Sequence, residues 1–355
     1  MTRHGSESFF VAEPEETGLR DERLRRTGWT RGAAALAWCA AVALLGAFAS
    51  PSWAGTAFTA NNLDDDVTFV NTDANDKVGN DVNVGDGPRA LAVTPNGRFV
   101  YVANKDSDNV SVIDTERHRR VGTPIRAGDQ PRGIVMAPDG DRVYTANRIS
   151  NSVSVINTNT NTKLTKIEVG RRPHGITITP NGRRVYVADN DDAAVSVINT
   201  LTNRTVGSQI DVGGGPEGMT ATPDGDSVYV ANFFDDTVSV IDTATKDVIE
   251  TIDVGGGPTG IAANPVLPRV YVTNESSGTV NVIDTTTRQV IGMPIRVGSG
   301  PVSVAFTRDG SRAYVANRFS GSLSVIDTAT NMRVGGQIDV GRGPRGVAVT
   351  HRSVD

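Results

Sequence analysis

Cysteine, tryptophan and aromatic residues in general are scarce in this sequence. Its 355 residues include one cysteine, three tryptophans and 5% aromatic residues. A single cysteine excludes a disulfide framework, a zinc site with several cysteine ligands and an iron–sulfur cluster. Leucine, glutamate and lysine are also sparse beside 38 glycines, which argues against helical bundles and coiled coils. The formal charge of -5 gives no global indication of nucleic-acid binding, although it allows a local basic patch.

The first 54 residues have the pattern of an export signal. A charged stretch is followed by an apolar run from Gly32 to Ala49, and small residues at Ser52 and Ala54 then form a cleavage site. The pattern predicts a signal peptide over 1–54, with an uncleaved membrane anchor as the alternative, because about 18 apolar residues can just span a bilayer. After cleavage we expect residues 55–355 to be secreted, periplasmic or at the cell surface, without membrane insertion.

One repeat unit accounts for the rest of the chain. Seven prolines, each in a glycine-rich turn, are spaced 42 or 43 residues apart: Pro88, Pro131, Pro173, Pro216, Pro258, Pro301 and Pro344. Each unit contains four short runs rich in valine, isoleucine and threonine, separated by turn residues, which predicts strands A, B, C and D. A period of this length with short strands is typical of a β-propeller built from four-stranded antiparallel blades.

The two ends of this region complete each other. After Pro344 the sequence offers only a strand A, from Gly346 to Thr350. Near the start, Ala57–Asn61 and Val67–Thr72 match strands B and C of the repeat, and no strand A precedes them. The sequence therefore predicts six continuous blades and a seventh that pairs the C-terminal strand A with N-terminal strands B to D. Such closure removes free sheet edges.

The tyrosines carry a family resemblance. All six occupy one position of the repeat: Tyr101, Tyr144, Tyr186, Tyr229, Tyr271 and Tyr314. We expect them to pack against the adjacent blade. The run Tyr271-Val272-Thr273-Asn274 and its variants resemble the YVTN family of β-propeller repeat proteins over essentially all of 55–355. The resemblance implies a propeller of surface-layer or periplasmic type but no single activity, because similar propellers include lactonase-like, nucleic-acid-binding and unassigned proteins.

Positions that vary between repeats mark the candidate site. Small residues in strand A suit a crowded axis, so this strand is predicted to be innermost, with the D–A and B–C loops on one face. The residue after each repeat proline then lies at the channel mouth: Arg89, Arg132, His174, Glu217, Thr259, Val302 and Arg345. The B–C loops on the same face begin with Asn62, Lys105, Arg148, Asn190, Phe233, Glu275 and Arg318.

A basic crescent with aromatic neighbours predicts an anionic ligand at this face. The candidate ligand-binding residues are Arg89, Arg132, His174, Arg345, Lys105, Arg148, Arg318, Phe233, Phe234 and Phe319. Such a surface suits an anionic polymer, such as single-stranded nucleic acid or glycan, or an anionic small molecule. Ordinary solvated loop charge is the alternative, because several aspartates share the face.

Signals for catalysis are few. The sequence has no Gly-x-Ser-x-Gly elbow, no Cys-x-x-Cys-His haem attachment and no phosphate-binding loop, and its histidines are dispersed. We therefore predict no metal and no cofactor. His174 and Glu217, on adjacent blades, are the candidate general acid and base. The sequence favours a monomeric, non-catalytic binding or scaffold protein, with a propeller enzyme of lactonase or lyase type as the alternative.

Overall fold

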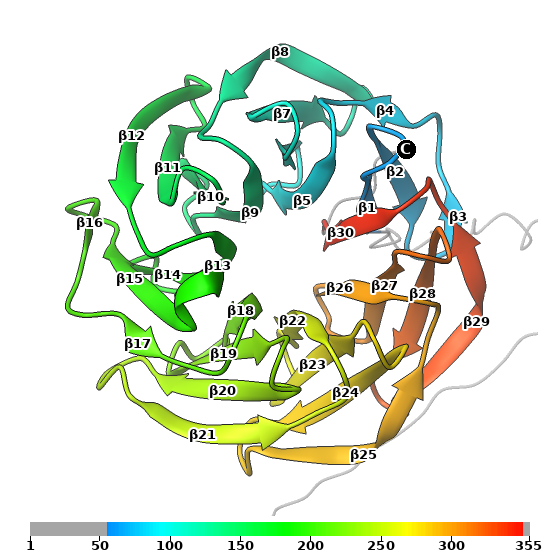
Figure 1. The fold of residues 1–355 in the computed structure, drawn as a ribbon. Coiled ribbons are helices and arrows are strands. Elements are labelled where there is room, and N and C mark those ends of the chain that lie inside the picture. The colour runs from blue at the N-terminus through cyan, green and yellow to red at the C-terminus, as the bar shows by residue number, and fades with distance from the viewer. Residues whose placement is uncertain (1–54, 351–355) are drawn as a thin grey trace, which may run out of the picture. The chain divides into compact units, whose positions relative to one another are not determined.

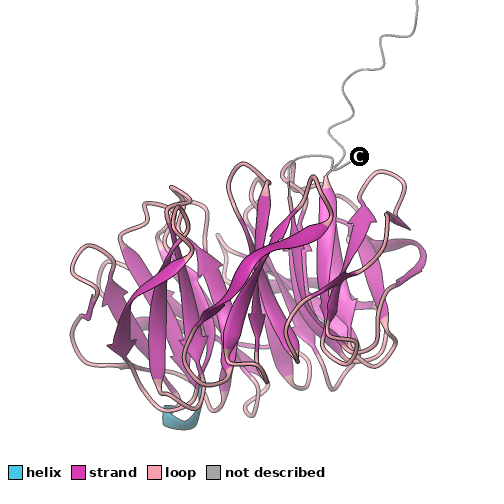
Figure 2. Ribbon diagram, turned by 90° about the horizontal axis from the view of Figure 1, so that it is seen from above, coloured by secondary structure: helices cyan, strands magenta, loops and turns pink. Residues whose placement is uncertain are grey.

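The computed structural model describes residues 55–350, and the predicted export signal lies outside them. These residues form seven antiparallel sheets arranged around a central axis (Figure 1). Among the described residues the only helix is the short 3-10 turn η1 (Asn190–Asp192). Seen from the side, the strands run between two faces that carry the loops (Figure 2). The prediction of an all-β, seven-bladed propeller is confirmed.

Blades one to six are each continuous in sequence. Blade one contains β5 (Pro88–Val93), β6 (Phe99–Asn104), β7 (Asn109–Asp114) and β8 (Arg119–Arg126), and blade two contains β9 (Pro131–Met136), β10 (Arg142–Asn147), β11 (Ser152–Asn157) and β12 (Thr162–Glu168). Blade three contains β13 (Pro173–Ile178), β14 (Arg184–Asp189), β15 (Ala194–Asn199) and an outer strand divided into β16 (Arg204–Thr205) and β17 (Ile210–Asp211).

The remaining continuous blades repeat this order. Blade four contains β18 (Pro216–Ala221), β19 (Ser227–Asn232), β20 (Thr237–Asp242) and β21 (Val248–Asp253). Blade five contains β22 (Pro258–Ala263), β23 (Arg269–Asn274), β24 (Thr279–Asp284) and β25 (Gln289–Arg296). Blade six contains β26 (Pro301–Phe306), β27 (Arg312–Asn317), β28 (Ser322–Asp327) and β29 (Met332–Asp339).

Blade seven is assembled from both ends of the described chain. It contains β1 (Thr56–Asn61), β2 (Asp66–Asn71), β3 (Asp76–Lys77), β4 (Val82–Asn83) and β30 (Pro344–Val349). Strand β30 pairs antiparallel with β1, placing Val347 opposite Thr59, and the Thr59 hydroxyl donates a hydrogen bond of 3.1 Å to the Gly346 carbonyl. The predicted closure is therefore confirmed, and it leaves no inner strand edge unpaired in this blade.

The inner strands approach one another so closely that glycine is required. A Cβ atom on Gly133 would lie 2.4 Å from the His174 carbonyl oxygen, and one on Gly175 would lie 2.1 Å from that of Glu217. The prediction that strand A is innermost is confirmed (Figure 1). This packing fixes the backbone beside each of these glycines. It therefore also fixes the Cα position of the preceding residue, which lies at the channel mouth.

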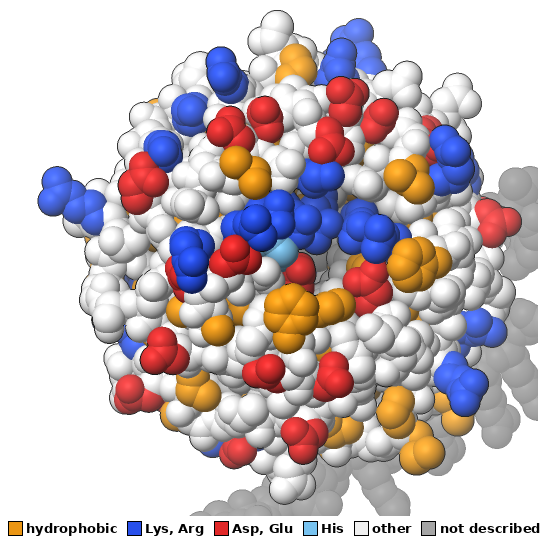
Figure 3. All heavy atoms as spheres, viewed as in Figure 1, with side chains coloured by type: hydrophobic (Ala, Val, Ile, Leu, Met, Phe, Trp, Pro, Cys, Tyr) orange, Lys and Arg blue, Asp and Glu red, His pale blue; other side chains and the backbone are white. Residues whose placement is uncertain are grey.

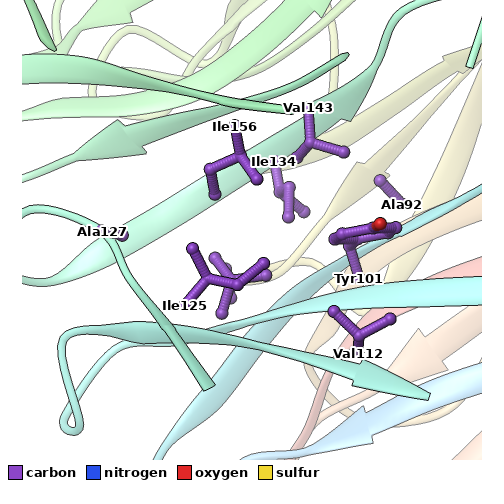
Figure 4. Packing of buried hydrophobic residues seen from close by; sticks show 10 residues of the cluster. Ala92, Tyr101, Val112, Ile125, Ala127, Ile134, Val143 and Ile156 are labelled. Carbon is purple, nitrogen blue, oxygen red and sulfur yellow. The ribbon is translucent and has the colours of Figure 1, made fainter. Parts of the chain in front are cut away.

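The core lies between neighbouring blades, and the tyrosines are part of it. Tyr101 of blade one packs in a cluster that includes Ile134 and Val143 of blade two (Figure 4). Its hydroxyl donates a hydrogen bond of 2.7 Å to Asn161 Oδ1, in the C–D turn of the same neighbour. The predicted structural role of the tyrosines is confirmed: each joins its blade to the next by an apolar ring and, in several blades, by a hydrogen bond.

Candidate functional site

A cavity of about 360 Å³ opens at the channel mouth. The residue after the repeat proline contributes to its lining in every blade, giving a ring that we call the mouth ring: Arg89, Arg132, His174, Glu217, Thr259, Val302 and Arg345. Two residues further along each inner strand, an apolar side chain lines the deeper part: Leu91, Ile134, Ile176, Met219, Ile261, Val304 and Val347. The cavity therefore has a polar entrance and an apolar lower tier.

Three arginines of the mouth ring stand on consecutive blades seven, one and two. Burial, followed by repulsion from Arg89, lowers the pKa of Arg132 to about 9 and that of Arg345 to about 10. Burial also lowers the pKa of Arg89, against the attraction of Glu217. Arg132 and Arg345 are therefore still charged at neutral pH, and a guanidinium group such as that of Arg89 keeps its proton in proteins, so like charges lie together in a partly desolvated site. Figure 3 shows the resulting band of basic side chains across the mouth.

His174 and Glu217 form the best-defined contact in the ring. His174 Nδ1 lies 2.8 Å from Glu217 Oε1, and Arg89 Nη2 lies 3.6 Å from Glu217 Oε2. Burial alone would raise the pKa of Glu217, but the hydrogen bond from His174 and the positive charges of Arg89 and Arg132 lower it to about 2. Glu217 is therefore a carboxylate at neutral pH, and it cannot act there as a general acid.

The contacts of His174 define its protonation. Arg132 Nη1 lies 3.0 Å and Arg148 Nε 3.3 Å from His174 Nε2. A guanidinium group can only donate hydrogen bonds, so Nε2 accepts and the ring proton lies on Nδ1, where it is donated to Glu217. Burial lowers the pKa of His174, consistent with a neutral ring. The imidazole thus links a carboxylate to two arginines, and the lone pair that a general base would use is occupied.

Positive charge exceeds negative charge in this cluster. Arg318 Nη1 pairs with Glu275 Oε1 at 3.0 Å, and Arg89 faces Glu217. Arg132 and Arg345 have no carboxylate within ion-pair distance anywhere in residues 55–350, and Arg132 Nε is buried without a hydrogen-bond partner there. A buried cation of this kind is costly unless a counter-charge is present. The cluster therefore holds more positive than negative charge in a partly buried position.

The structure places some of the other predicted ligand-binding residues at the cavity and the rest outside it. Phe233 lines the cavity, and Arg148 reaches it through His174. Lys105 instead pairs with Asp106 at 2.8 Å, while Phe234 and Phe319 are exposed on the same face outside the cavity lining.

Sequence reasoning missed one functional contact, the pairing of Glu275 with Arg318. Both residues had been located at the start of a B–C loop, on neighbouring blades five and six, and that shared position was the available signal. Glu275 also lines the cavity, so it belongs to the site.

Between residues 55 and 350, no group of three or more His, Cys, Asp or Glu side chains is placed to hold a metal ion. Within the same range no helix has the length and apolar character needed to cross a membrane.

Fold and site together define a seven-bladed β-propeller with a cationic cavity at one mouth of its channel. The chain belongs to the YNCE-like β-propeller family, whose sequence model matches residues 28–149 and 250–353. Residues 114–207 also match a family described as lactonases with a seven-bladed β-propeller. No curated protein matches the chain.

Solved structures from several organisms share the fold. Hydrazine synthase of Kuenenia stuttgartiensis is 27% identical with a TM-score of 0.70, covering 77% of this chain and 92% of that one. A candidate 6-phosphogluconolactonase of Bacteroides fragilis is 19% identical with a TM-score of 0.72, covering 85% and 99%. Apo AztD of Citrobacter koseri is 14% identical with a TM-score of 0.65, covering 84% and 98%. At such low identities the last two show similarity of fold alone.

Proposed function

We propose that the protein binds a small anionic ligand in the cavity at the channel mouth, as a binding protein and not as an enzyme. The observation that carries the proposal is the absence of a carboxylate partner for Arg132 and Arg345 within residues 55–350. A carboxylate or phosphate group in the cavity would supply both the missing charge and the hydrogen-bond acceptors that guanidinium groups favour. Because Arg148, which contacts His174 and Gln130, also lacks a carboxylate partner within the same range of residues, a dianion would balance the charge better than a monoanion.

The distribution of acidic residues favours a small ligand over a long polymer. Asp106, Asp235 and Asp236 are exposed on the loops around the mouth. Asp235 and Asp236 accept hydrogen bonds from the backbone of the D–A loops, which holds these carboxylates in place. A polyanion lying across the face would meet this negative charge, whereas a small anion inside the cavity would meet mainly arginine.

Titration calorimetry with phosphate and sulfate at low ionic strength tests the proposal. A charge-assisted hydrogen bond contributes about 1.5–3 kcal/mol, so Arg132→Gln combined with Arg345→Gln should weaken binding at least tenfold. Arg342→Gln is the matched control, because Arg342 lies on the same face but pairs with Asp64 and is largely exposed. Equal affinity of the cavity variant and the wild type would rule the proposal out.

A lactonase-type enzyme is the second candidate. The His174–Glu217 pair and the match of residues 114–207 to the lactonase family favour it. Catalysis would require the two arginines to release His174 Nε2 so that it could accept a proton from water. Hydrolysis of six-membered sugar lactones, with and without a phosphate group, tests this function. Turnover that disappears in His174→Gln would support the enzyme and contradict the binding proposal.

We also propose that the protein is a monomer that acts outside the cytoplasm. The pattern of residues 1–54 and the YVTN-like repeats support this location. N-terminal sequencing of the exported protein should begin at Gly55. Light scattering after size-exclusion chromatography should give the mass of one chain. A retained N-terminus or a dimer mass would contradict the corresponding part of this proposal.

A further inference from the structure

One position of the repeat places apolar side chains in solvent around the mouth. It is the second residue of each B–C loop, which we call the outer-rim position: Leu63, Asp106, Ile149, Asp191, Phe234, Ser276 and Phe319. The four apolar members are 64% (Leu63), 49% (Ile149), 72% (Phe234) and 64% (Phe319) exposed. Exposed apolar residues gathered on one face indicate an interaction surface more often than residues scattered singly do.

The two exposed phenylalanines are held in fixed positions. The amide of Phe234 donates a hydrogen bond of 3.1 Å to the Gly214 carbonyl, and that of Phe319 donates one of 3.0 Å to Ser299. The Phe234 ring lies against Gly215, where a Cβ atom would clash with it, and Phe319 lies in the same way against Gly300. Because the rings are already ordered, little conformational entropy would be lost when a partner covers them.

Both rings connect to the cavity. Phe234 meets Phe233 edge to face, with ring centroids 5.5 Å apart, and Phe233 lines the cavity. Arg318 lies over the Phe319 ring, 4.9 Å from its centroid, and pairs with the cavity residue Glu275. Phe234 and Phe319 belong to blades four and six. Blade five, between them, presents small residues beside the half-buried Glu275 in its loops on this face: Gly255, Gly256, Gly257, Ser276 and Ser277.

We propose that this surface docks a peptide segment of a partner protein, with apolar side chains on Phe234 and Phe319 and an acidic side chain entering the mouth. The small residues of blade five leave room for a backbone to cross between the two rings. The acidic side chain rests on the proposed function, because it would occupy the anion cavity. Figure 3 shows apolar side chains next to the basic band, the combination that such a segment complements.

A nucleic acid fits the same surface less well. Its bases could stack on the two rings, but its phosphates would pass Asp235 and Asp236, both exposed and next to Phe234. A peptide backbone carries no net charge, so these aspartates do not oppose it. The hydroxyl groups of two exposed serines on blade five, Ser276 and Ser277, can also donate hydrogen bonds to peptide carbonyls.

Selection from a phage-displayed library of random dodecapeptides tests the proposal. The immobilised full chain is the bait, and enriched peptides are then synthesised and titrated against variants. We expect peptides with an acidic residue flanked by apolar ones, and at least tenfold weaker binding to Phe234→Ser combined with Phe319→Ser. Leu201→Ser is the matched control, because Leu201 is 84% exposed but lies in a C–D turn, on the opposite face.

Each other outcome overturns the proposal. The proposal fails if no peptide is enriched, and it fails if the enriched peptides bind the double phenylalanine variant as tightly as the wild type. An oligo(dT) strand that binds the wild type and loses affinity in that variant would assign the surface to nucleic acid instead. Phosphate titration of the wild type reports on the cavity separately, so failure of the docking surface and failure of the anion site can be distinguished.

Discussion

The tyrosine position and the mouth ring are made by the same repeat, yet they differ in how the blades use them. Six blades place tyrosine and one places Phe58 at the first position, and all seven rings are almost completely buried. At the second position the blades carry arginine, histidine, glutamate, threonine and valine. Because the surrounding backbone is equivalent, the difference separates two tasks: the constant position stabilises the ring of blades, and the variable position is the one that we propose recognises a ligand.

If this division is right, substitutions at constant positions should change stability, and substitutions at the mouth should change binding. The largest expected effect comes from removing the closing strand. Deletion of residues 344–355 removes β30, exposes the edge of β1 and uncovers apolar residues such as Ala57 that pack beneath it. We expect loss of cooperative thermal unfolding, followed by circular dichroism, because a single open blade weakens its contacts with both neighbours.

A matched control keeps this test specific to closure. Deletion of residues 351–355 alone removes chain without touching β30. It should leave the melting temperature unchanged. A protein lacking 344–355 that melts as cooperatively and at the same temperature as the control would show that the two ends do not hold the ring together.

The next effect concerns Asp189, which ends β14 where the other blades place asparagine. It is completely buried, and burial raises its pKa from 3.8 to about 6 despite hydrogen bonds from Ser196 and Gln209. The folded state therefore binds the proton more tightly than the unfolded state. Stability falls as the pH rises from about 4 to about 6, and the full cost, about 2–3 kcal/mol, is present at neutral pH.

Asp189→Asn should remove this cost. We expect a gain of about 1–3 kcal/mol in the free energy of unfolding at pH 7, because Asn147 shows that an amide at this position can donate to a serine of the next strand. Urea unfolding at pH 7 and at pH 3.5 measures it. The gain should shrink toward zero at the lower pH. A gain of equal size at both pH values would contradict the titration of Asp189 as its cause.

A smaller effect separates two tyrosines at the same repeat position. The Tyr314 hydroxyl has two acceptors for its one hydrogen across the closure between blades six and seven: Asn75 Oδ1 at 2.7 Å and the Thr72 carbonyl at 3.0 Å. The Tyr186 hydroxyl is buried and has no hydrogen-bond partner in residues 55–350. Tyr314→Phe should therefore cost about 1 kcal/mol, whereas Tyr186→Phe should cost nothing or stabilise slightly.

Urea unfolding of the two phenylalanine variants, measured side by side, gives the free energy of unfolding that each one loses. Both substitutions remove one oxygen atom from the same position of the repeat, so each serves as the control for the other. Equal losses in the two would mean that the contact with the next blade's turn does not contribute to closure.

The fold could be predicted from sequence because its signals repeat. Seven prolines at nearly constant spacing, and strand fragments at the two ends that complete one unit, leave few alternatives to a closed ring. The mouth ring followed from its place beside the repeat proline. The close packing of the inner strands agrees with that placement, since a Cβ atom on Gly133 or Gly175 would collide with a carbonyl oxygen of the next inner strand.

The contacts inside the site could not be predicted in the same way. Whether Arg318 turns toward Glu275, or His174 accepts from Arg132, depends on side-chain torsions, which the repeat pattern does not specify. Phe233 and Phe234 are neighbours in sequence, yet one lines the cavity and the other is exposed, because consecutive residues of a loop point in different directions. The position of a residue in the repeat predicts the place of its backbone in the fold, but not which partner its side chain contacts.

The smallest expected effect on stability is at the mouth, and it is the sharpest test of the division between the two positions. Arg345 has no hydrogen-bond or ion-pair partner among the described residues, and burial together with repulsion from Arg89 lowers its pKa. Arg345→Gln should therefore leave the free energy of unfolding at pH 7 unchanged or raise it slightly, while weakening anion binding.

Arg312→Gln is the comparison, because Arg312 donates a hydrogen bond of 2.7 Å to the Thr72 carbonyl across the closure. The Arg312→Gln variant should lose about 1–2 kcal/mol in its free energy of unfolding and keep its affinity for phosphate. If Arg345→Gln instead destabilised the protein as much as Arg312→Gln did, the mouth ring would be part of the framework and the separation of the two tasks would fail.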